Sequence, residues 1–401
     1  MPVIEIQPSI YWIGVNDHTT DLFEGIWPIT QEGVSYNSYL IDGEKKVLID
    51  LAKSIKADQF FRQISEICEI SQLDYIVLNH MEPDHTGTLG LLWKLAPQAT
   101  ILCTPQAQPM VESFYGITER VQPVDDGETI NLGQLTLKFF HTPFVHWPET
   151  MMTYETSSRT LFSCDAFGSY GALSGTIFDD QLNDFDFYLK QALRYYVNIV
   201  AKFSSMVTRA IQKLADIPIK IIAPSHGLIW KNDPQKIVDL YQTWARLANG
   251  KGDRAVTLVY GSMYGNTEEM MDAVAQGVAQ AGIPVEIFDL RRTHFSYILP
   301  ALWLHQGVII GAPTYETALF PLAVQLLDLC HRKAIKNKKV AYFGSFGWSG
   351  GGQRELEKWA TELKWELTDT LVFRGAATLE DLKKGQQFGR EFAKMLKEDL
   401  V

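Results

Sequence analysis

Four potential metal ligands lie within six positions of a single segment. His80, Glu82, Asp84 and His85 follow the short apolar run at 75–78. Imidazole nitrogens and carboxylate oxygens are the donors that proteins use for divalent transition metals. A solvated polar loop has the same composition, so the segment alone does not establish a metal site.

Three more candidates occur further along the chain. His146, Asp165 and His226 follow, with 60, 18 and 60 intervening residues from His85 onward. Asp165 and His226 come just after apolar strand-like runs. Because the carboxyl ends of strands in an α/β architecture line a common edge, we expect the seven side chains to converge on one site.

The donor set indicates the chemistry. Three carboxylates supply hard oxygen ligands that offset the charge of two cations and suit iron or manganese, and four imidazoles complete the set. Two metals bridged by one carboxylate, roughly 3.5–4 Å apart, can hold a small diatomic molecule between them. Donor type alone leaves zinc open, since zinc binds such ligands more tightly than ferrous iron.

The segment 80–85 reads H-x-E-x-D-H. It resembles the H-x-H-x-D-H signature of the metallo-β-lactamase superfamily, with Glu82 in place of the second histidine. That replacement, the later spacing and the C-terminal half of the chain resemble the flavodiiron proteins. The resemblance implies that one iron is bound by His80, Glu82 and His146, that the other is bound by Asp84, His85 and His226, and that Asp165 bridges them.

A second group of residues has the character of a phosphate site. The expected strand 255–260 runs into a turn of small hydroxyl residues and glycines, where backbone amides and a helix N-terminus can surround a phosphate. The turn lacks the lysine of a P-loop and is not a G-x-G-x-x-G motif. It resembles the S/T-x-x-G-N-T loop of flavodoxins, formed here by Ser262, Met263, Tyr264, Gly265, Asn266 and Thr267.

Two later segments complete the expected flavin site. Both follow apolar strands, at the edge where a flavodoxin-like sheet holds its ring. Tyr315 and Trp348 offer aromatic faces, and the glycines allow close backbone approach. The candidates are Pro313, Thr314, Tyr315, Ser345, Phe346, Gly347, Trp348, Gly350 and Gly351. One phosphate loop without an adenosine-binding motif favours FMN.

The elements that must position the metal candidates include both strands and helices. The first 250 residues read as β-rich with interleaved helices. Hairpin signals occur at 38–51, turning at Asp42-Gly43, and at 129–140. Short strands are expected at 75–78, 160–163 and 220–223. Apolar residues at three- and four-residue steps predict one long helix over about 182–214.

The pattern of expected strands and helices changes at the polar, glycine-rich segment 249–253, which is the best candidate for a linker between domains. Beyond it, five apolar strands alternate with helical patterns such as 268–281 and 321–331, which predicts a parallel, doubly wound sheet. The strands are expected at 255–260, 285–288, 307–310, 340–343 and 371–373. We therefore expect an α/β chain with a metallo-β-lactamase-like αββα domain at 1–250 and a flavodoxin-like domain at 251–401.

Composition narrows the class of partners. The 401 residues carry a formal charge of -11, so nucleic acid and anionic membrane surfaces are poor candidates. We find no run of 18 apolar residues and no secretory signal pattern. The four cysteines are far apart and form no C-x-x-C pair, which argues against disulfides, a zinc ribbon or a rubredoxin-type iron site. We therefore expect the protein to reside in a reducing compartment, the cytoplasm.

The resemblance implies a reductase that converts dioxygen to water, nitric oxide to nitrous oxide, or both. It implies FMN and two iron ions as cofactors, a head-to-tail homodimer or a dimer of dimers, and an external electron donor such as rubredoxin. The diiron centre itself is the catalytic group, with no separate acid or base. The alternatives are a zinc hydrolase carrying a flavodoxin module and a gas-binding sensor.

Several aromatic residues next to the candidates have two interpretations. Trp147 and Phe167 adjoin metal candidates, and they either exclude water from the pocket or pack generically. Tyr195 and Tyr196 lie on the expected long helix. The resemblance to the flavodiiron proteins implies a tyrosine beside the substrate pocket, but the sequence does not choose between the two and favours core packing for both.

Overall fold

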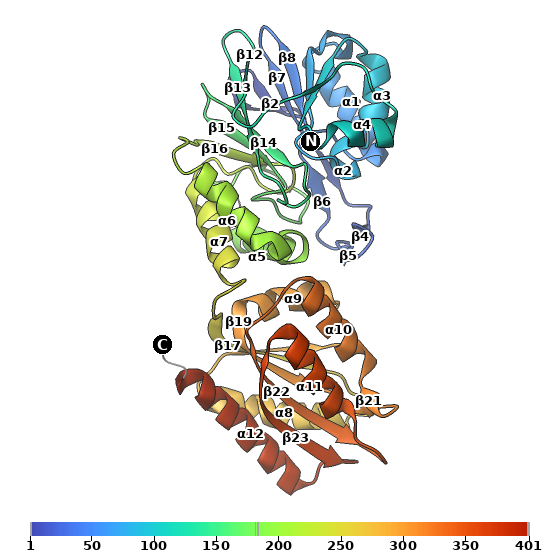
Figure 1. Ribbon diagram of the computed structural model, residues 1–401, viewed down its shortest axis with the longest axis vertical. Coiled ribbons are helices and arrows are strands. Elements are labelled where there is room, and N and C mark those ends of the chain that lie inside the picture. The colour runs from blue at the N-terminus through green and yellow to red at the C-terminus, as the bar shows by residue number, and fades with distance from the viewer. Residues whose placement is uncertain (1, 181, 183, 399–401) are drawn as a thin grey trace. The chain divides into compact units, whose positions relative to one another are not determined.

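The computed structural model describes residues 2–180, 182 and 184–398. The chain forms two compact units, Met1–Ala245 and Arg246–Val401 (Figure 1). Within the described part, no helix has the length and apolar character needed to cross a membrane.

The first unit contains two main sheets. The larger has the order β1 (Ile4–Gln7), β2 (Ile10–Trp12), β7 (Tyr39–Asp42), β8 (Lys46–Ile49), β9 (Tyr75–Val77), β10 (Thr100–Cys103) and β11 (Val121–Pro123). The smaller has the order β12 (Thr129–Asn131), β13 (Thr136–His141), β14 (Met151–Glu155), β15 (Thr160–Cys164) and β16 (Ile221–Pro224).

Apolar residues from both sheets form one core. Ile41 and Val77 of the larger sheet belong to the same buried cluster as Phe139, Phe162 and Ile221 of the smaller one. Their inward-facing side chains therefore hold the two sheets face to face, as in a β-sandwich. This layering is that of a metallo-β-lactamase-like domain.

Helices and short ribbons complete this unit. The helices are α1 (Ala57–Ser65), α2 (Pro83–Thr86), α3 (Leu89–Leu95), α4 (Gln108–Tyr115), α5 (Phe185–Tyr195), α6 (Ser204–Lys213) and α7 (Pro234–Arg246), with 3₁₀ turns η1 (Ser54–Lys56) and η2 (Ile70–Gln72). The ribbons pair β3 (Val15–Asp17) with β6 (Val34–Tyr36), and β4 (Leu22–Phe23) with β5 (Trp27–Pro28). Helices α1, α3 and α4 group on one side of the unit, and α6 and α7 on another (Figure 1).

The predicted hairpins at 38–51 and 129–140 are confirmed as β7–β8 and β12–β13. The continuous helix predicted over 182–214 is wrong. It begins at Phe185, passes into a π-helical segment η3 (Tyr196–Val200) and a 3₁₀ turn η4 (Ala201–Phe203), and resumes as α6. Periodicity over a long window does not register a wider turn of this kind, which is frequent at functional sites.

The second unit has one parallel sheet in the order β18 (Val285–Asp289), β17 (Asp253–Tyr260), β19 (His305–Gly311), β22 (Lys339–Phe346) and β23 (Glu366–Arg374). In chain order this is 2-1-3-4-5, the flavodoxin-like arrangement. The predicted parallel, doubly wound sheet is confirmed. A small ribbon joins β20 (Thr314–Tyr315) to β21 (Ala318–Leu319).

Five helices accompany this sheet: α8 (Asn266–Gln280), α9 (Phe295–Leu304), α10 (Pro321–Arg332), α11 (Gly352–Leu363) and α12 (Leu379–Glu398). Met270 and Val274 of α8 and Phe392 of α12 share a buried cluster with Val256 and Ile309 of the sheet. These contacts fix the N-terminal end of α8 at the edge where the candidate phosphate loop lies.

Candidate metal centre

The first four candidates come from one loop and one short helix. His80 and Glu82 follow β9, and Glu82 directly precedes α2, whose first residue is proline. Proline is pre-organised for the first helical position, so α2 begins at once and carries Asp84 and His85. This places the four side chains around a single turn of chain.

The remaining three candidates arrive from the smaller sheet. Asp165 follows β15, His226 lies just beyond β16, and His146 lies in the loop between β13 and β14. Since β15 and β16 are parallel neighbours, their carboxyl ends bring Asp165 and His226 to one edge, as the sequence predicts.

One half of the cluster surrounds one carboxylate oxygen of Asp165. The Nε2 atoms of His80 and His146 lie 3.3 and 3.2 Å from Oε2 of Glu82. Both Nε2 atoms also lie 3.5 Å from Oδ2 of Asp165. The donor atoms of His80, His146 and Glu82 thus face a common point next to Oδ2 of Asp165.

The other half surrounds the second oxygen of Asp165. Nε2 of His85 and Nε2 of His226 lie 3.2 and 3.3 Å from Oδ1 of Asp165. The same two nitrogens lie 3.5 and 3.3 Å from the Asp84 carboxylate. Asp165 therefore presents one oxygen to each half, which is the geometry of a bridging carboxylate.

The donor atoms fit a pair of cations. Oδ1 of Asp84 and Nε2 of His85 and His226 are buried and make no hydrogen bond within the described residues. Buried polar atoms of this kind need a partner. Single ions could be held by His80, His146 and Asp165, and by Asp84, His85 and His226. Two divalent metals would satisfy all of these donors at once.

The electrostatic field also favours positive charge here. Burial alone lowers the pKa of a histidine, but the surrounding carboxylates outweigh it and raise the pKa of His80 and His226 to about 10 and that of His85 to about 9. Burial opposes ionisation of Glu82, yet its contacts with His146 and His80 lower its pKa to about 2. Metal binding at such histidines displaces protons.

Further groups orient the imidazoles. Nδ1 of His80 lies 2.7 Å from Oε1 of Glu149, which also accepts a hydrogen bond from the Met81 backbone at 3.0 Å. Nδ1 of His226 lies 2.7 Å from the carbonyl oxygen of Ser35. A hydrogen bond at Nδ1 fixes the tautomer and directs Nε2 toward the metal. The sequence analysis missed both groups, because neither belongs to a motif.

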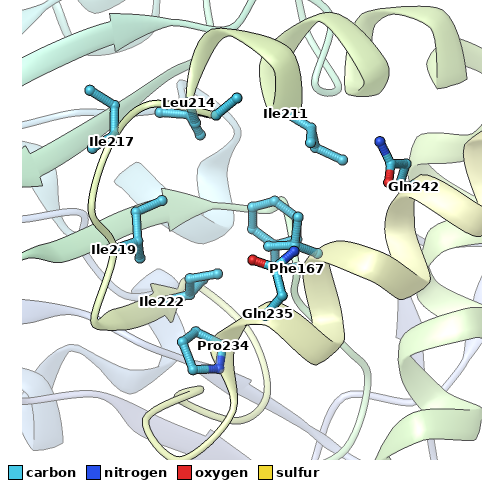
Figure 2. Close-up of a pocket in the computed structure, with 11 residues that line it drawn as sticks. Phe167, Ile211, Leu214, Ile217, Ile219, Ile222, Pro234, Gln235 and Gln242 are labelled. Carbon is cyan, nitrogen blue, oxygen red and sulfur yellow. The ribbon is translucent and has the colours of Figure 1, made fainter.

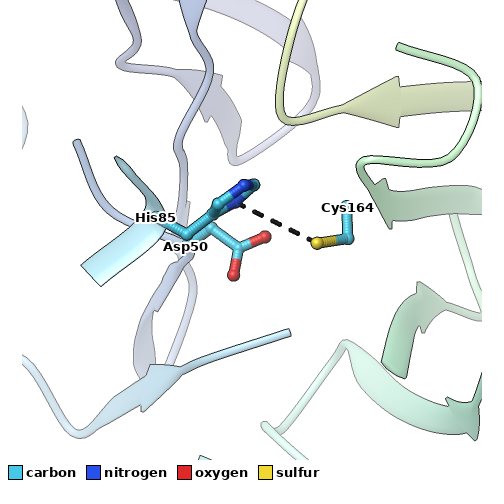
Figure 3. Close-up of side chains that lie close together, drawn as sticks. All are labelled: Asp50, His85 and Cys164. Carbon is cyan, nitrogen blue, oxygen red and sulfur yellow. Dashed lines mark hydrogen bonds between the residues drawn. The ribbon is translucent and has the colours of Figure 1, made fainter. Parts of the chain in front are cut away.

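Behind His85 lie Asp50 and Cys164 (Figure 3). Sγ of Cys164 lies 4.0 Å from Nδ1 of His85. The Asp50 carboxylate accepts hydrogen bonds from the Asn79 backbone and side-chain amides at 2.8 and 3.0 Å and from Ser225 Oγ at 3.1 Å. Its oxygens are therefore occupied in joining the loops that carry His80 and His226, and this group supports the centre.

The structure distinguishes the two tyrosines. Tyr195 is buried at the end of α5 and its hydroxyl donates to Oδ1 of Asp165 at 2.7 Å. The hydroxyl of Tyr196 instead pairs with Ser204 Oγ at 2.7 Å. Core packing, the favoured interpretation of both, is therefore incomplete for Tyr195. The π-helical segment begins immediately after Tyr195.

We expect Tyr195→Phe to lower the turnover number of the reaction at the metal centre by roughly tenfold, while both metals stay bound. The phenol donates to a charged acceptor, and such a bond contributes about 1.5–3 kcal/mol. Turnover, metal content and the reduction potential of the centre are the measurements. Tyr196→Phe is the matched control, because it removes a hydroxyl one residue away that bonds to Ser204. Equal effects of both variants would refute a role for the Asp165 contact.

The two aromatic neighbours differ in position. Trp147 packs edge-on against His80 with ring centroids 5.0 Å apart, so it borders the centre. Phe167 instead contacts Tyr241 and lines a cavity of about 380 Å³ (Figure 2). The other residues around that cavity are mainly aliphatic, including Ile211, Leu214 and Ile222, and it contains no metal candidate.

The flavin candidates lie together at one edge of the second sheet. The loop 261–265 joins β17 to α8, and Gly265 precedes α8 with φ +97°, a left-handed conformation that favours glycine. Ser262 Oγ accepts from the Gly265 amide at 3.0 Å, and Thr267 Oγ1 lies 3.2 Å from Ser345 Oγ. The first and third segments therefore meet at the start of α8.

The aromatic candidates here are exposed. Trp348 and Tyr264 are 78% and 90% exposed, and Tyr315 is 40% exposed. Ser345 and Phe346 are the last residues of β22, so that strand extends further than predicted. A Cβ at Gly351 would lie 1.7 Å from the Thr317 carbonyl oxygen, which explains its glycine by close backbone approach. The remaining candidates, Met263, Asn266, Pro313, Thr314, Gly347 and Gly350, lie in the same three segments.

One residue that the sequence analysis did not select supports the phosphate loop. Arg291 donates through Nη1 to the Ser262 carbonyl at 2.7 Å and through Nη2 to Asp289 and Glu268 at 2.6 and 3.0 Å. These contacts fix the loop against the end of β18.

Comparisons with known proteins agree with this architecture. Residues 34–227 match the model of the ODP family beta lactamase, and residues 258–387 match that of flavodoxin. The anaerobic nitric oxide reductase flavorubredoxin of Escherichia coli K12 is 34% identical over 397 residues, which cover 98% of this chain and 82% of the relative.

Solved structures agree over nearly the whole chain. The rubredoxin oxygen:oxidoreductase of Desulfovibrio gigas aligns with a TM-score of 0.93 and 27% identity, covering 99% of each chain. The flavodiiron protein of Giardia intestinalis aligns with a TM-score of 0.94 and 28% identity, covering 99% of this chain and 97% of that one. With a metallo-β-lactamase-like domain, a flavodoxin-like domain and a relative of this identity and coverage, the chain belongs to the flavodiiron protein family.

Proposed function

We propose that this protein reduces dioxygen to water, nitric oxide to nitrous oxide, or both, with electrons that pass through FMN to a pair of iron ions. The observation that supports this most directly is the division of seven donor residues into two halves that share Asp165. The names of the relatives, a nitric oxide reductase and an oxygen oxidoreductase, point to the same two substrates.

The assignment of ligands follows the two halves. One iron is bound by His80, Glu82 and His146, the other by Asp84, His85 and His226, and Asp165 bridges them. His85 is included because its Nε2 atom is buried without a hydrogen bond and lies 3.2 Å from Asp165. When bound, the iron ions supply one-electron steps and Lewis acidity.

The electron count suits this combination. Reduction of dioxygen to two waters takes four electrons and four protons, and a reduced flavin with two ferrous ions holds four electrons. Reduction of two nitric oxide molecules to nitrous oxide and one water takes two electrons and two protons. Both reactions are therefore within the capacity of one chain.

The residues of the chain position and shield the centre. Glu149 and the Ser35 carbonyl orient two imidazoles, and Tyr195 donates to the oxygen of Asp165 that faces the second half. Trp147 lies against His80 and helps to exclude water. Polar groups in a buried site interact more strongly than in water. These surrounding residues therefore strengthen the binding of metal and substrate.

The FMN site is proposed at the three segments of the second unit. The phosphate would lie at the N-terminus of α8, where amide groups of residues 262–267 and the helix dipole favour an anion. Tyr315 and Trp348 would contact the ring, with Pro313, Thr314, Ser345, Phe346, Gly347, Gly350 and Gly351 forming its surroundings.

We expect Trp348→Ala to weaken FMN binding by about tenfold. Loss of an aromatic contact removes about 0.5–1.5 kcal/mol beyond the buried area, and 1.4 kcal/mol corresponds to a tenfold change in affinity. Fluorescence titration of the flavin-free protein with FMN measures the effect. Leu379→Ala removes an equally exposed apolar side chain from the start of α12 and serves as the control. Unchanged affinity would contradict the proposed ring contact.

The remaining assignments extend this proposal. The metal domain is taken as residues 1–250 and the FMN domain as 251–401. A small rubredoxin is the proposed electron donor, and a head-to-tail homodimer or a dimer of such dimers is the proposed assembly. Cross-linking with mass measurement in solution tests the assembly, and reduction by added rubredoxin tests the donor.

The function itself is tested with the loaded protein. Protein isolated without air is assayed for iron and flavin, reduced chemically, and placed in oxygen and nitric oxide electrodes. Consumption over many turnovers is the expected result. Inertness toward both gases with FMN and two irons bound would refute the proposal, and binding of one gas molecule per centre without turnover would indicate a sensor. The zinc hydrolase alternative is not favoured by the relatives.

A further inference from the structure

A short hairpin lies against the metal centre. Strands β4 and β5 pair with Phe23 opposite Trp27, and both rings are buried. The Phe23 ring packs edge-on against His226 with centroids 5.5 Å apart, and it also contacts Tyr170 and Tyr195. The hairpin is therefore held at a fixed position beside the ligands.

The tip of this hairpin brings a third carboxylate to the first half of the centre. Atoms of Glu24, Glu82 and His146 that can bind a metal all lie within 4.8 Å of one another. Ligand atoms on opposite sides of one metal, at roughly 2.0–2.2 Å each, are up to about 4.4 Å apart. A shift of a few tenths of an ångström would let all three contact one ion.

The orientation of Glu24 is set by its neighbour. Nε1 of Trp27 donates to Oε2 of Glu24 at 2.9 Å. Because Trp27 is 2% exposed, this bond fixes one carboxylate oxygen. An exposed glutamate without such a bond would sample many rotamers, and holding it in one rotamer lowers the entropic cost of binding a ligand.

A buried tyrosine gives independent support. The Tyr170 hydroxyl is fully buried and makes no hydrogen bond within the described residues. Burial is the main reason that the pKa of Tyr170 lies well above its ordinary value. Arg194 and Asn198 partly offset this rise in pKa, and the negative charges of Glu24 and Glu82 add to it. A polar molecule bound beside them would provide the partner that the hydroxyl lacks.

We propose that Glu24 is a further carboxylate ligand of the first iron position, beside Glu82 and His146. The inference rests on the proposed diiron function and adds a ligand to it. Glu24 is exposed, whereas His146 is buried. Glu24 is therefore the ligand that a ferrous ion arriving from solvent meets first, and it holds the ion as it reaches the buried donors.

The test is titration of metal-free protein with ferrous iron alone, without air. We expect wild type to bind two ions and Glu24→Gln to bind one of them about tenfold more weakly, the lower end of the range for losing a group that supports a metal. Glutamine keeps the size of the side chain and an acceptor for Trp27. Glu119→Gln removes the same charge from an exposed position after α4 and is the matched control.

A second readout separates coordination from general charge effects. Cobalt(II) absorption reports the ligands of the ion, so Glu24→Gln is expected to alter the visible bands of one bound cobalt, with Glu119→Gln unchanged. Thermal unfolding of the metal-free variants should coincide with wild type. Two tightly bound irons and identical cobalt spectra in wild type and Glu24→Gln would overturn the role of Glu24 alone. Failure of wild type to bind two irons would overturn the diiron function and this role with it.

Discussion

Asp165→Ala should bind iron at least about 100-fold more weakly than wild type and lose gas reduction. Among the described residues, Asp165 alone presents an oxygen to each half of the centre, with Nε2 atoms of four histidines at 3.2–3.5 Å. Loss of groups that merely orient a ligand weakens metal binding by about 10–100-fold, and loss of a shared ligand should exceed that. Iron content, titration with ferrous iron and the oxygen and nitric oxide electrodes measure the effect.

The control for this variant is Asp239→Ala, which removes an exposed carboxylate from α7. FMN content should stay at the wild-type level in both proteins, because the flavin candidates belong to the other unit. Retention of two tightly bound irons in Asp165→Ala would show that the two positions do not share this carboxylate.

Glu82→His is expected to shift the metal preference toward zinc and to abolish reduction of both gases. The substitution replaces a hard oxygen donor, 3.2–3.3 Å from two imidazoles, with a fifth nitrogen. With fewer carboxylates the site offsets less cationic charge and suits iron less well. Metal analysis after growth with both metals supplied, together with the electrode assays on iron-reconstituted protein, gives the result.

The effect of metal identity must be separated from that of geometry. Glu82→Gln removes the charge while keeping an oxygen donor, so it should retain more iron than Glu82→His. Full gas reduction by Glu82→His would show that the carboxylate does not select the chemistry of the centre.

The seven donor residues were predictable because their types are chemically distinctive and their positions follow strands. Asp165 and His226 stand just beyond apolar runs, and the parallel pairing of β15 with β16 is what brings them together. The parallel sheet of the second unit was predictable for a similar reason, since apolar strands alternate regularly with helical patterns.

Other parts of the centre leave no such trace. The partner of His226 is a backbone carbonyl, that of Ser35, which any residue could supply. Glu149 and Glu24 look like ordinary surface glutamates, because their roles depend on a loop and a hairpin whose approach to the centre is set by tertiary packing. The break after Tyr195 occurs without proline or glycine between 185 and 203, the residues that usually mark a helix irregularity.

The proposed ligands are distributed over both sheets of the first unit, and this has a consequence for its folding. His80 and its neighbours follow the larger sheet at β9, whereas Asp165 and His226 follow the smaller one at β15 and β16. Iron bound by the proposed ligands would thus cross-link the two layers, and its binding energy would oppose their separation. An ion present at 1,000 times its dissociation constant adds about 4 kcal/mol to the stability of the state that binds it. Loss of iron would therefore expose the interior between the two sheets to proteolysis, and the lifetime of the protein would follow metal supply.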